Sequence, residues 1–238
     1  MEIIPAIDLR HGACVRLYQG DYGREEVFDE DPSAVARRWH SCGARLVHVV
    51  DLDGAAEGRL VNRDGITTIM TVEDVGLEVG GGIRTKEDAD WLFERGVERV
   101  VLGTAAVEDP QLVASLVDTH AGAIVVSLDA RDGYVTTRGW LKGTTIPVSE
   151  LCERMWDAGV SRFVYTDVRR DGTMTEPNFD ALERLVRSTP APVTAAGGIS
   201  TLDHLRRLRD VGASGAILGK AIYVGSIDLG EALTLYGG

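Results

Sequence analysis

The stretch Gly80-Gly81-Gly82-Ile83-Arg84-Thr85 recurs later in the chain as Ala196-Gly197-Gly198-Ile199-Ser200-Thr201, at an offset of 116 residues (199 − 83). Each copy follows a short apolar run and precedes a helical pattern. Glycine residues let backbone N–H groups approach an anion closely, and the start of a helix adds a partial positive charge. The repeated stretch therefore predicts two phosphate-binding turns.

A second pair of glycine turns has the same offset. Leu102-Gly103-Thr104-Ala105 corresponds to Leu218-Gly219-Lys220-Ala221, again 116 residues apart (219 − 103). A single glycine turn before a helix is usually an ordinary tight turn. Four such turns in two pairs at one offset indicate an internal duplication that carries two phosphate sites.

Short apolar runs alternate with helical patterns along the whole chain. We predict strands at Glu2–Ile7, Arg45–Val50, Gly76–Val79, Arg99–Leu102, Ala123–Leu128, Arg162–Thr166, Val193–Ala195 and Gly215–Leu218. We predict helices at Pro32–Cys42, Asn62–Val72, Lys86–Arg95, Pro110–Thr119, Pro147–Ala158, Asn178–Ser188, Leu202–Val211 and Ile227–Leu235. Eight such units are typical of an α/β fold, a (β/α)8 TIM barrel built here from two repeated half-barrels. An open doubly wound sheet is the alternative, but its Gly-x-Gly-x-x-Gly fingerprint is absent after the first strand.

No linker divides the chain, so residues 1–238 are expected to form one barrel domain. The repeat divides it into half-barrels of approximately residues 1–120 and 121–238. Asp8 and Asp129 end the first and fifth strands at an offset of 121 residues (129 − 8), whereas the glycine turns have an offset of 116 (199 − 83). The additional residues of the first half therefore lie between the first and second strands. We expect the segment Arg10–Asp31 to form a mobile lid over one mouth of the barrel. The corresponding segment Ala130–Ile146 is also predicted as a long loop.

The composition restricts the class of protein. The chain has 238 residues and a formal net charge of −12, which argues against nucleic acid as a partner. No long apolar run predicts a membrane span, and no signal peptide is visible at the start. The three cysteines are widely spaced without a Cys-x-x-Cys motif, which favours a reducing compartment such as the cytoplasm. We expect a cytoplasmic protein, a monomer, with no metal site.

The strongest candidates for catalysis are Asp8 and Asp129. In barrels of this type the active residues lie at the C-terminal ends of the strands, and these two aspartates occupy such positions on opposite sides of the mouth. A strand-terminal aspartate can simply cap the following turn, but the symmetric placement favours function. Two carboxyl groups in a water-poor cleft can have different pKa values, so that one acts as base and the other as acid.

Other residues are candidates for substrate binding. Guanidinium groups match oxyanions in a bidentate way, and Lys220 follows a glycine turn where its charge suits a phosphate. His48 is either a core residue or a substrate contact, and Trp140 either stacks on a flat heterocycle or fills its own loop. Asp51 and Asp53 suit a role in turn formation as well as a role in the site. The predicted substrate-binding residues are Arg16, His48, Gly82, Arg84, Gly103, Thr104, Trp140, Thr166, Asp171, Gly172, Gly198, Gly219 and Lys220.

Several longer motifs, taken together, resemble a known family. They are Ile4-Pro5-Ala6-Ile7-Asp8-Leu9, His48-Val49-Val50-Asp51-Leu52-Asp53-Gly54-Ala55, Gly80-Gly81-Gly82-Ile83-Arg84, Arg138-Gly139-Trp140, Tyr165-Thr166-Asp167-Val168-Arg169-Arg170-Asp171-Gly172-Thr173 and Ala196-Gly197-Gly198-Ile199. From residue 2 to about residue 224 the chain resembles the aldose–ketose isomerase of histidine biosynthesis, which acts on the phosphoribosylformimino aminoimidazole carboxamide ribotide.

The resemblance implies a duplicated (β/α)8 barrel and a small-molecule substrate with a phosphate at each end. It implies that Asp8 is the proton acceptor and Asp129 the proton donor of an Amadori rearrangement, for which no cofactor is needed. One motif departs from the family pattern, because Glu176 stands before Pro177-Asn178 where the family usually has glycine. This departure affects the loop near one phosphate.

Three alternatives stay open at this point. The sister family is the cyclase subunit of imidazole glycerol phosphate synthase, whose first strand typically reads Ile-Pro-Cys-Leu-Asp with a lysine soon after, whereas Leu9 and Arg10 follow Asp8 here. A dual isomerase that also serves tryptophan synthesis shares much of the pattern. A non-catalytic sugar-phosphate binding protein could use the same barrel, but such a protein gains nothing from two carboxylates that face an anion.

Overall fold

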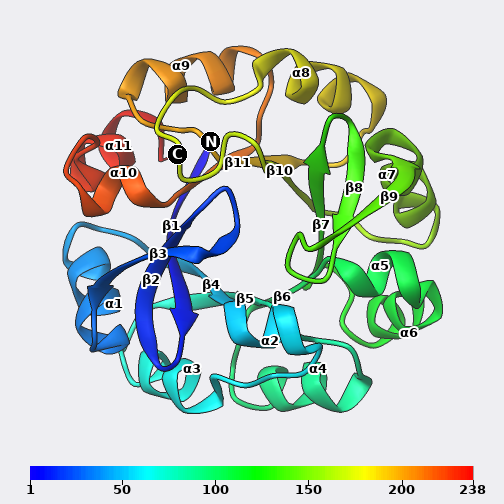
Figure 1. The fold of residues 1–238 in the computed structure, drawn as a ribbon, viewed down its shortest axis with the longest axis horizontal. Coiled ribbons are helices and arrows are strands. Elements are labelled where there is room, and N and C mark those ends of the chain that lie inside the picture. Colours follow the sequence, from blue (N-terminus) through cyan, green and yellow to red (C-terminus); the bar gives the residue numbers. More distant parts are fainter. Residues whose placement is uncertain (238) are drawn as a thin grey trace.

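Eight parallel strands within residues 1–237, the part of the chain that the computed structural model describes, form a closed barrel (Figure 1). In chain order they are β1 (Glu2–Arg10), β4 (Leu46–Asp51), β5 (Gly76–Gly80), β6 (Arg99–Leu102), β7 (Ile124–Arg131), β10 (Phe163–Asp167), β11 (Val193–Ala196) and β12 (Gly215–Leu218). Each strand pairs with the next in this order, and β12 pairs with β1. This closure confirms the (β/α)8 barrel and excludes the open doubly wound sheet.

Helices surround the barrel and connect its strands. The long ones are α1 (Pro32–Ser41), α3 (Arg63–Met70), α4 (Lys86–Phe93), α6 (Pro110–Thr119), α7 (Val148–Asp157), α8 (Phe179–Ser188), α9 (Leu202–Asp210) and α11 (Leu229–Tyr236). All of these were predicted. The short helices α2 (Leu52–Glu57), α5 (Thr104–Glu108) and α10 (Lys220–Tyr223) were not. Over residues 1–237, none of the helices combines the length and apolar character that crossing a bilayer requires.

Local sequence explains where several helices begin. The carboxylate of Asp31 accepts hydrogen bonds from the backbone N–H groups of Ser33 and Ala34 at the start of α1. Thr85 and Thr201, which end the two copies of the repeated stretch, each accept a backbone N–H in the same way at the start of α4 and α9. Such caps satisfy N–H groups that have no partner within the helix. The repeated glycine turns are therefore held at fixed positions by the helices that follow them.

The apolar core has two layers, because successive residues of a strand point to opposite faces. The larger layer lies between the barrel and its helices. The smaller fills the barrel interior and consists of Ile4, Ala6, Leu46, Val101, Val125, Val164 and Ile217. Residues further toward the C-terminal ends of the same strands point inward above this layer, and they form the floor of the site.

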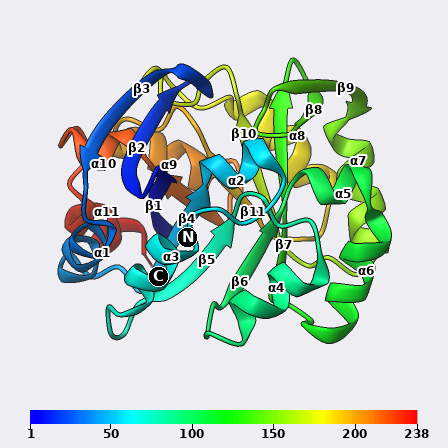
Figure 2. The ribbon, with the colours of Figure 1, turned by 60° about the horizontal axis from the view of Figure 1, so that its bottom comes forward.

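The prediction that Arg10–Asp31 and Ala130–Ile146 are loops was wrong. The first segment forms the strands β2 (Ala13–Tyr18) and β3 (Asp21–Asp29), an antiparallel hairpin that continues from β1 and is called the lid hairpin below. The second contains β8 (Tyr134–Thr137) and β9 (Lys142–Pro147), which extend β7. Figure 2 shows both hairpins at the same end of the barrel. The lid hairpin lacks an apolar face along β3, so the sequence carried no alternating pattern that would have revealed it.

Candidate active site

Two neighbouring cavities lie at the end of the barrel where the strands terminate. The larger, with an empty volume of about 1010 Å³ that includes space open to solvent, is lined by Asp8, His48, Gly82, Arg84, Gly103, Thr104, Asp129, Trp140, Thr166 and Asp171 among others. The smaller, of about 380 Å³, is lined by Arg16, Asp171, Gly172, Gly198, Gly219 and Lys220 among others. Asp171 and Ala196 line both, so the two spaces adjoin. The structure brings every site residue predicted from the sequence to one cavity or the other.

Asp8 lies at the end of β1 and forms an ion pair with Arg16 of the lid hairpin. Nη1 of Arg16 donates a hydrogen bond to Oδ2 of Asp8 at 2.8 Å, and both side chains are largely buried. The same guanidinium lies against the glycine turn that follows β12, because a Cβ atom on Gly219 would be 3.0 Å from its Nη1. Its Nε is buried without a hydrogen-bond partner. Arg16 therefore connects a candidate catalytic carboxylate with a candidate phosphate turn.

Asp129 lies at the end of β7 and faces the larger cavity. Burial raises the pKa of its carboxyl group, although hydrogen bonds from Ser127, Trp140 and Thr166 oppose the shift. The Ser127 hydroxyl donates to Oδ1 at 2.7 Å. A carboxyl group with a raised pKa holds its proton to higher pH, as a general acid must.

Asp171 is the third carboxyl group at this mouth. Burial and the negative charge of Asp8 raise its pKa to about 7, even though Arg16 lowers it. The charge of Asp129 acts in the same direction as that of Asp8. Carboxyl groups that share a water-poor site repel one another when all of them are ionised. The site therefore contains one carboxyl group, that of Asp171, whose pKa lies near neutral pH.

The first glycine turn follows β5. Gly81 and Gly82 have φ angles of +96° and +75°, which L residues with side chains rarely adopt. A Cβ atom on Gly82 would lie 2.4 Å from the carbonyl oxygen of Arg59, so only glycine fits. Nearby, Glu108 of α5 forms ion pairs with Arg84 at 3.5 Å and with Arg138 at 2.9 Å. Cationic side chains therefore lie beside this turn.

The second glycine turn follows β11 and has nearly the same backbone geometry. Gly197 and Gly198 have φ angles of +85° and +78°. A Cβ atom on Gly198 would lie 2.5 Å from the backbone oxygen of Glu176, the residue that departs from the family pattern. The Glu176 carboxylate lies 3.4 Å from Arg207 of α9. Lys220 follows β12 and lines the same cavity as this turn, and its ammonium group contacts Glu26 of the lid hairpin at 2.7 Å.

The lid hairpin covers the mouth and contacts the segments on both sides. A Cβ atom on Gly20 would lie 2.3 Å from the ring of Trp140, so the tip of the hairpin packs directly on the indole. Gln19 donates its backbone N–H to the carbonyl oxygen of Asp171 at 3.1 Å. The Trp140 side chain also acts against burial by lowering the pKa of the Asp129 carboxyl group. In this state Trp140 belongs to the wall of the cavity and to the contact with the lid.

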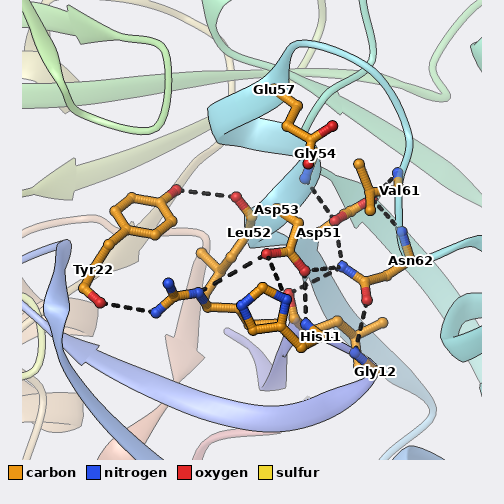
Figure 3. A network of polar contacts seen from close by, with 12 residues as sticks. His11, Gly12, Tyr22, Asp51, Leu52, Asp53, Gly54, Glu57, Val61 and Asn62 are labelled. Carbon is orange, nitrogen blue, oxygen red and sulfur yellow. Dashed lines mark hydrogen bonds and ion pairs between the residues drawn. The ribbon is translucent and has the colours of Figure 1, made fainter.

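Asp51 and Asp53, for which the sequence left two interpretations open, form turns. The carboxylate of Asp51 is fully buried and accepts hydrogen bonds from the backbone of Gly54, Val61 and Asn62 and from the Asn62 side chain (Figure 3). Asp53 accepts hydrogen bonds from the backbone N–H of His11 and from the Asn62 side chain. These contacts fix α2 and the start of the lid hairpin, and neither carboxylate lines the cavities.

Some lining residues were missed from the sequence. Ser127 stands two residues before Asp129 in the same strand, so the alternation of strand side chains could have placed it in the site. Thr136 and Thr137 lie in β8, which was not predicted, so no signal was available. The hydroxyl oxygen of Thr137 is buried without a hydrogen-bond partner beside the cavity. Arg138 was part of a motif but not of the predicted set.

Comparison with known proteins agrees with this geometry. The chain matches the family described as "Histidine biosynthesis protein" over residues 2–228. A protein of Dehalococcoides mccartyi is 52% identical over 232 residues, 98% of this chain and 95% of that protein. It is named 1-(5-phosphoribosyl)-5-((5-phosphoribosylamino)methylideneamino) imidazole-4-carboxamide isomerase.

Relatives with the same name occur in other bacteria. The one from Roseiflexus castenholzii is 50% identical over 236 residues, 99% of this chain and 100% of that protein. The one from a Picosynechococcus species is 49% identical over 240 residues, 100% of this chain and 94% of that protein. With a family match over nearly its whole length and relatives of this identity, the chain belongs to the histidine biosynthesis protein family and is an isomerase.

Proposed function

We propose that this chain catalyses the aldose–ketose isomerisation, an Amadori rearrangement, of the bisphosphorylated ribotide for which its relatives are named. The observation that carries the proposal is the arrangement of the larger and smaller cavities. Carboxyl groups from opposite strands, Asp8 of β1 and Asp129 of β7, face a continuous space that has a glycine turn with cationic side chains at each end. A substrate with one phosphate at each end fits this arrangement.

The reaction moves two protons on the ribose. An acid protonates the ring oxygen, the C1–O bond breaks, and the electron pair of the neighbouring nitrogen forms an imine with C1. A base then removes the proton from C2, which gives an enolamine, and the enolamine tautomerises to the ketose. Asp8 acts as the base, in keeping with its ion pair with Arg16, and Asp129 acts as the acid. Asp171, whose pKa is about 7, is the second candidate for the acid.

The phosphates anchor the substrate so that the reacting atoms lie between the two carboxyl groups. One phosphate binds at Gly82, Gly103 and Thr104 with Arg84, and the other binds at Gly172, Gly198, Gly219 and Lys220 with Arg16. General acid and base groups typically contribute about 10²–10⁴ each to the rate, so positioning contributes much of the rest. His48 and Thr166 contact the ribose, and Trp140 stacks on the heterocycle.

Replacement of the carboxyl groups tests the proposal. Asp8→Asn or Asp129→Asn keeps size and much of the hydrogen bonding but removes proton transfer, so kcat should fall by at least about 10³. KM should change little, because the phosphates hold the substrate. The double variant should be scarcely slower than either single variant, since both residues serve one proton-transfer sequence. If Asp129→Asn keeps more than about a tenth of the wild-type kcat, the acid is Asp171 instead.

A spectroscopic assay separates this function from the alternatives. Turnover of the ribotide changes its absorbance, whereas a binding protein takes it up without change. The same assay with the tryptophan-pathway substrate distinguishes the single isomerase from the dual one. We further propose that the protein works as a monomer in the cytoplasm, with its small-molecule substrate as partner and neither nucleic acid nor membrane. Sedimentation at assay concentration checks the monomer.

A further inference from the structure

A row of charged side chains runs through the interior of the barrel. His48, Glu78 and Arg99 lie on the neighbouring strands β4, β5 and β6, and Glu78 is the direct register partner of both other residues. Inward positions of such barrels are normally filled by branched apolar side chains, as the interior layer around Val101 is here. The charged row therefore interrupts an otherwise apolar interior.

The row has short contacts at its two ends and a longer one in its middle, between Glu78 and Arg99. Nδ1 of His48 lies 2.7 Å from Oε1 of Glu78. The other carboxylate oxygen of Glu78 accepts from Arg99 at 3.5 Å, and Arg99 holds Glu2 at the far end of the barrel through contacts of 2.8 and 3.0 Å. Glu78 is 2% exposed. The row thus begins at the cavity with His48 and ends with Glu2.

The charge on Glu78 is costly to bury, and its neighbours maintain it. Burial alone would raise the pKa of the Glu78 carboxyl group, but the hydrogen bond with His48 and the charge of Arg99 outweigh burial and keep the pKa below its usual range. Well-packed apolar residues in place of a buried ion pair are often neutral or even stabilising. Stability alone therefore does not account for a carboxylate at this position, whereas an effect on His48 does.

A histidine ring presents different chemistry through its two nitrogens. The nitrogen that donates to a fixed acceptor carries the proton, which leaves the other nitrogen as a hydrogen-bond acceptor. Because Glu78 occupies Nδ1, Nε2 is the nitrogen left for the cavity that His48 lines. We propose that Glu78 is a positioning residue that fixes the proton of His48 on Nδ1, so that Nε2 accepts a hydrogen bond from a hydroxyl group of the substrate. The substrate part of this inference rests on the proposed function.

The test measures the His48 ring directly. Nitrogen-15 NMR of histidine-labelled protein at about pH 8, where a free imidazole is neutral, reports which ring nitrogen carries the proton. The His48 signal is identified by its loss in His48→Gln. We expect the proton on Nδ1 in the wild type and a shift toward Nε2 in Glu78→Gln. A wild-type ring protonated on Nε2 overturns the inference, and this result needs only the His48→Gln variant, for the assignment of the signal.

Kinetics with a matched control separate positioning from a structural role. In Glu78→Gln we expect kcat/KM to fall about 10- to 100-fold, the usual cost of losing the carboxylate that orients a functional histidine. Glu2→Gln breaks the other end of the row and should leave the His48 signal unchanged and kcat/KM within about twofold of the wild type. In a His48→Gln background, the Glu78 substitution should add no further loss. Equal losses in Glu78→Gln and Glu2→Gln, with an unchanged His48 signal, overturn the inference. If the wild type does not turn over the ribotide at all, the proposed function fails, and the NMR result still decides the role of Glu78.

Discussion

Asp171 combines a functional position with an unfavourable charge. Its folded-state pKa of about 7 lies above the ordinary value of 3.8, so the folded protein binds this proton more tightly than the unfolded chain does. The contribution of Asp171 to stability is therefore most favourable below about pH 4 and is lost as the pH rises to about 7. Asp171→Asn removes the charge, so above about pH 7 the variant should be more stable than the wild type by ~1–4 kcal/mol.

Urea unfolding of Asp171→Asn and wild type at about pH 4 and about pH 8 measures this difference. The difference should be largest at the higher pH and should vanish at the lower one. Asp157→Asn, at the exposed end of α7, is the control and should change stability little at either pH. A variant that is less stable than the wild type at about pH 8 would contradict the explanation, because it would mean that the charged form of Asp171 stabilises the fold.

Site residues could be predicted from the sequence where they lie at the C-terminal ends of predicted strands. Asp8, Asp129 and the glycine turns could be placed because parallel strands that close a barrel all end at the same mouth. Glu78 could not, although a glutamate within an apolar strand is unusual. Its role depends on the register that brings it beside His48 and Arg99, and register is a property of the folded sheet.

At the scale of elements, β3 is the more exposed strand of the lid hairpin, and the strand that holds it by backbone pairing is β2. Strand β3 pairs only with β2, and most of its residues are exposed. We therefore expect its amide hydrogens to exchange faster than those of β5 in the free enzyme and to slow when substrate or product binds, because a bound phosphate near Arg16 and Lys220 adds contacts across the mouth. Hydrogen exchange followed by mass spectrometry measures both states. Equally slow exchange in the two states would rule out gating by this hairpin.

The glycine turn that follows β12 allows a test of phosphate binding. Gly219 has an ordinary φ of −102°, but an added Cβ would lie 3.0 Å from the Arg16 guanidinium. Gly219→Val should therefore raise KM by at least about tenfold, an effect of about 1.4 kcal/mol on binding, while the free energy of unfolding changes less. Gly143→Val in β9, where a Cβ would meet no atom within 4 Å, is the control. Steady-state kinetics and urea unfolding on both variants compare the two effects.

Most of the elements could be predicted, and two of the missed strands, β3 and β9, share one cause. The eight barrel strands and the helices between them bury apolar side chains, so their periodicity is visible in the sequence. β3 and β9 bury few side chains and are held by backbone hydrogen bonds to one neighbouring strand. Backbone hydrogen bonds do not require an alternation of apolar and polar residues, so the sequence contains no pattern that predicts these strands. These two strands were therefore the parts of the hairpins over the site that the sequence could not reveal.

At the scale of the whole molecule, we propose that the barrel arose by duplication of a half-barrel. Asn62 donates to Asp51 at 2.7 Å, and Asn178 donates to Asp167 at 2.7 Å. The residues of these two pairs are 116 positions apart, as are the glycine turns (178 − 62 and 167 − 51). The two halves thus contain the same Asn–Asp contact, and both of its residues are offset by 116 positions. This agreement supports duplication better than the repeated glycine motif does alone.

The two halves should nevertheless unfold together. They meet at two seams, where β6 pairs with β7 and β12 pairs with β1. Loss of either half would leave two open strand edges and would expose the interior layer, to which Ile4 and Leu46 contribute from one half and Val125 and Ile217 from the other. This cost makes a half-folded state unfavourable, so a single cooperative transition is expected for the chain.

Tryptophan fluorescence can follow the two halves separately, because Trp39 and Trp91 lie in the first and Trp140 and Trp156 in the second. In a variant with Trp140→Phe and Trp156→Phe, fluorescence reports only the first half, while far-ultraviolet circular dichroism reports the whole chain. Both signals should give the same urea midpoint and the same slope. Replacement of Trp39 and Trp91 instead should give a fluorescence midpoint from the second half that again matches circular dichroism of the same variant. Two separate midpoints in either variant would mean that the half-barrels fold as independent domains.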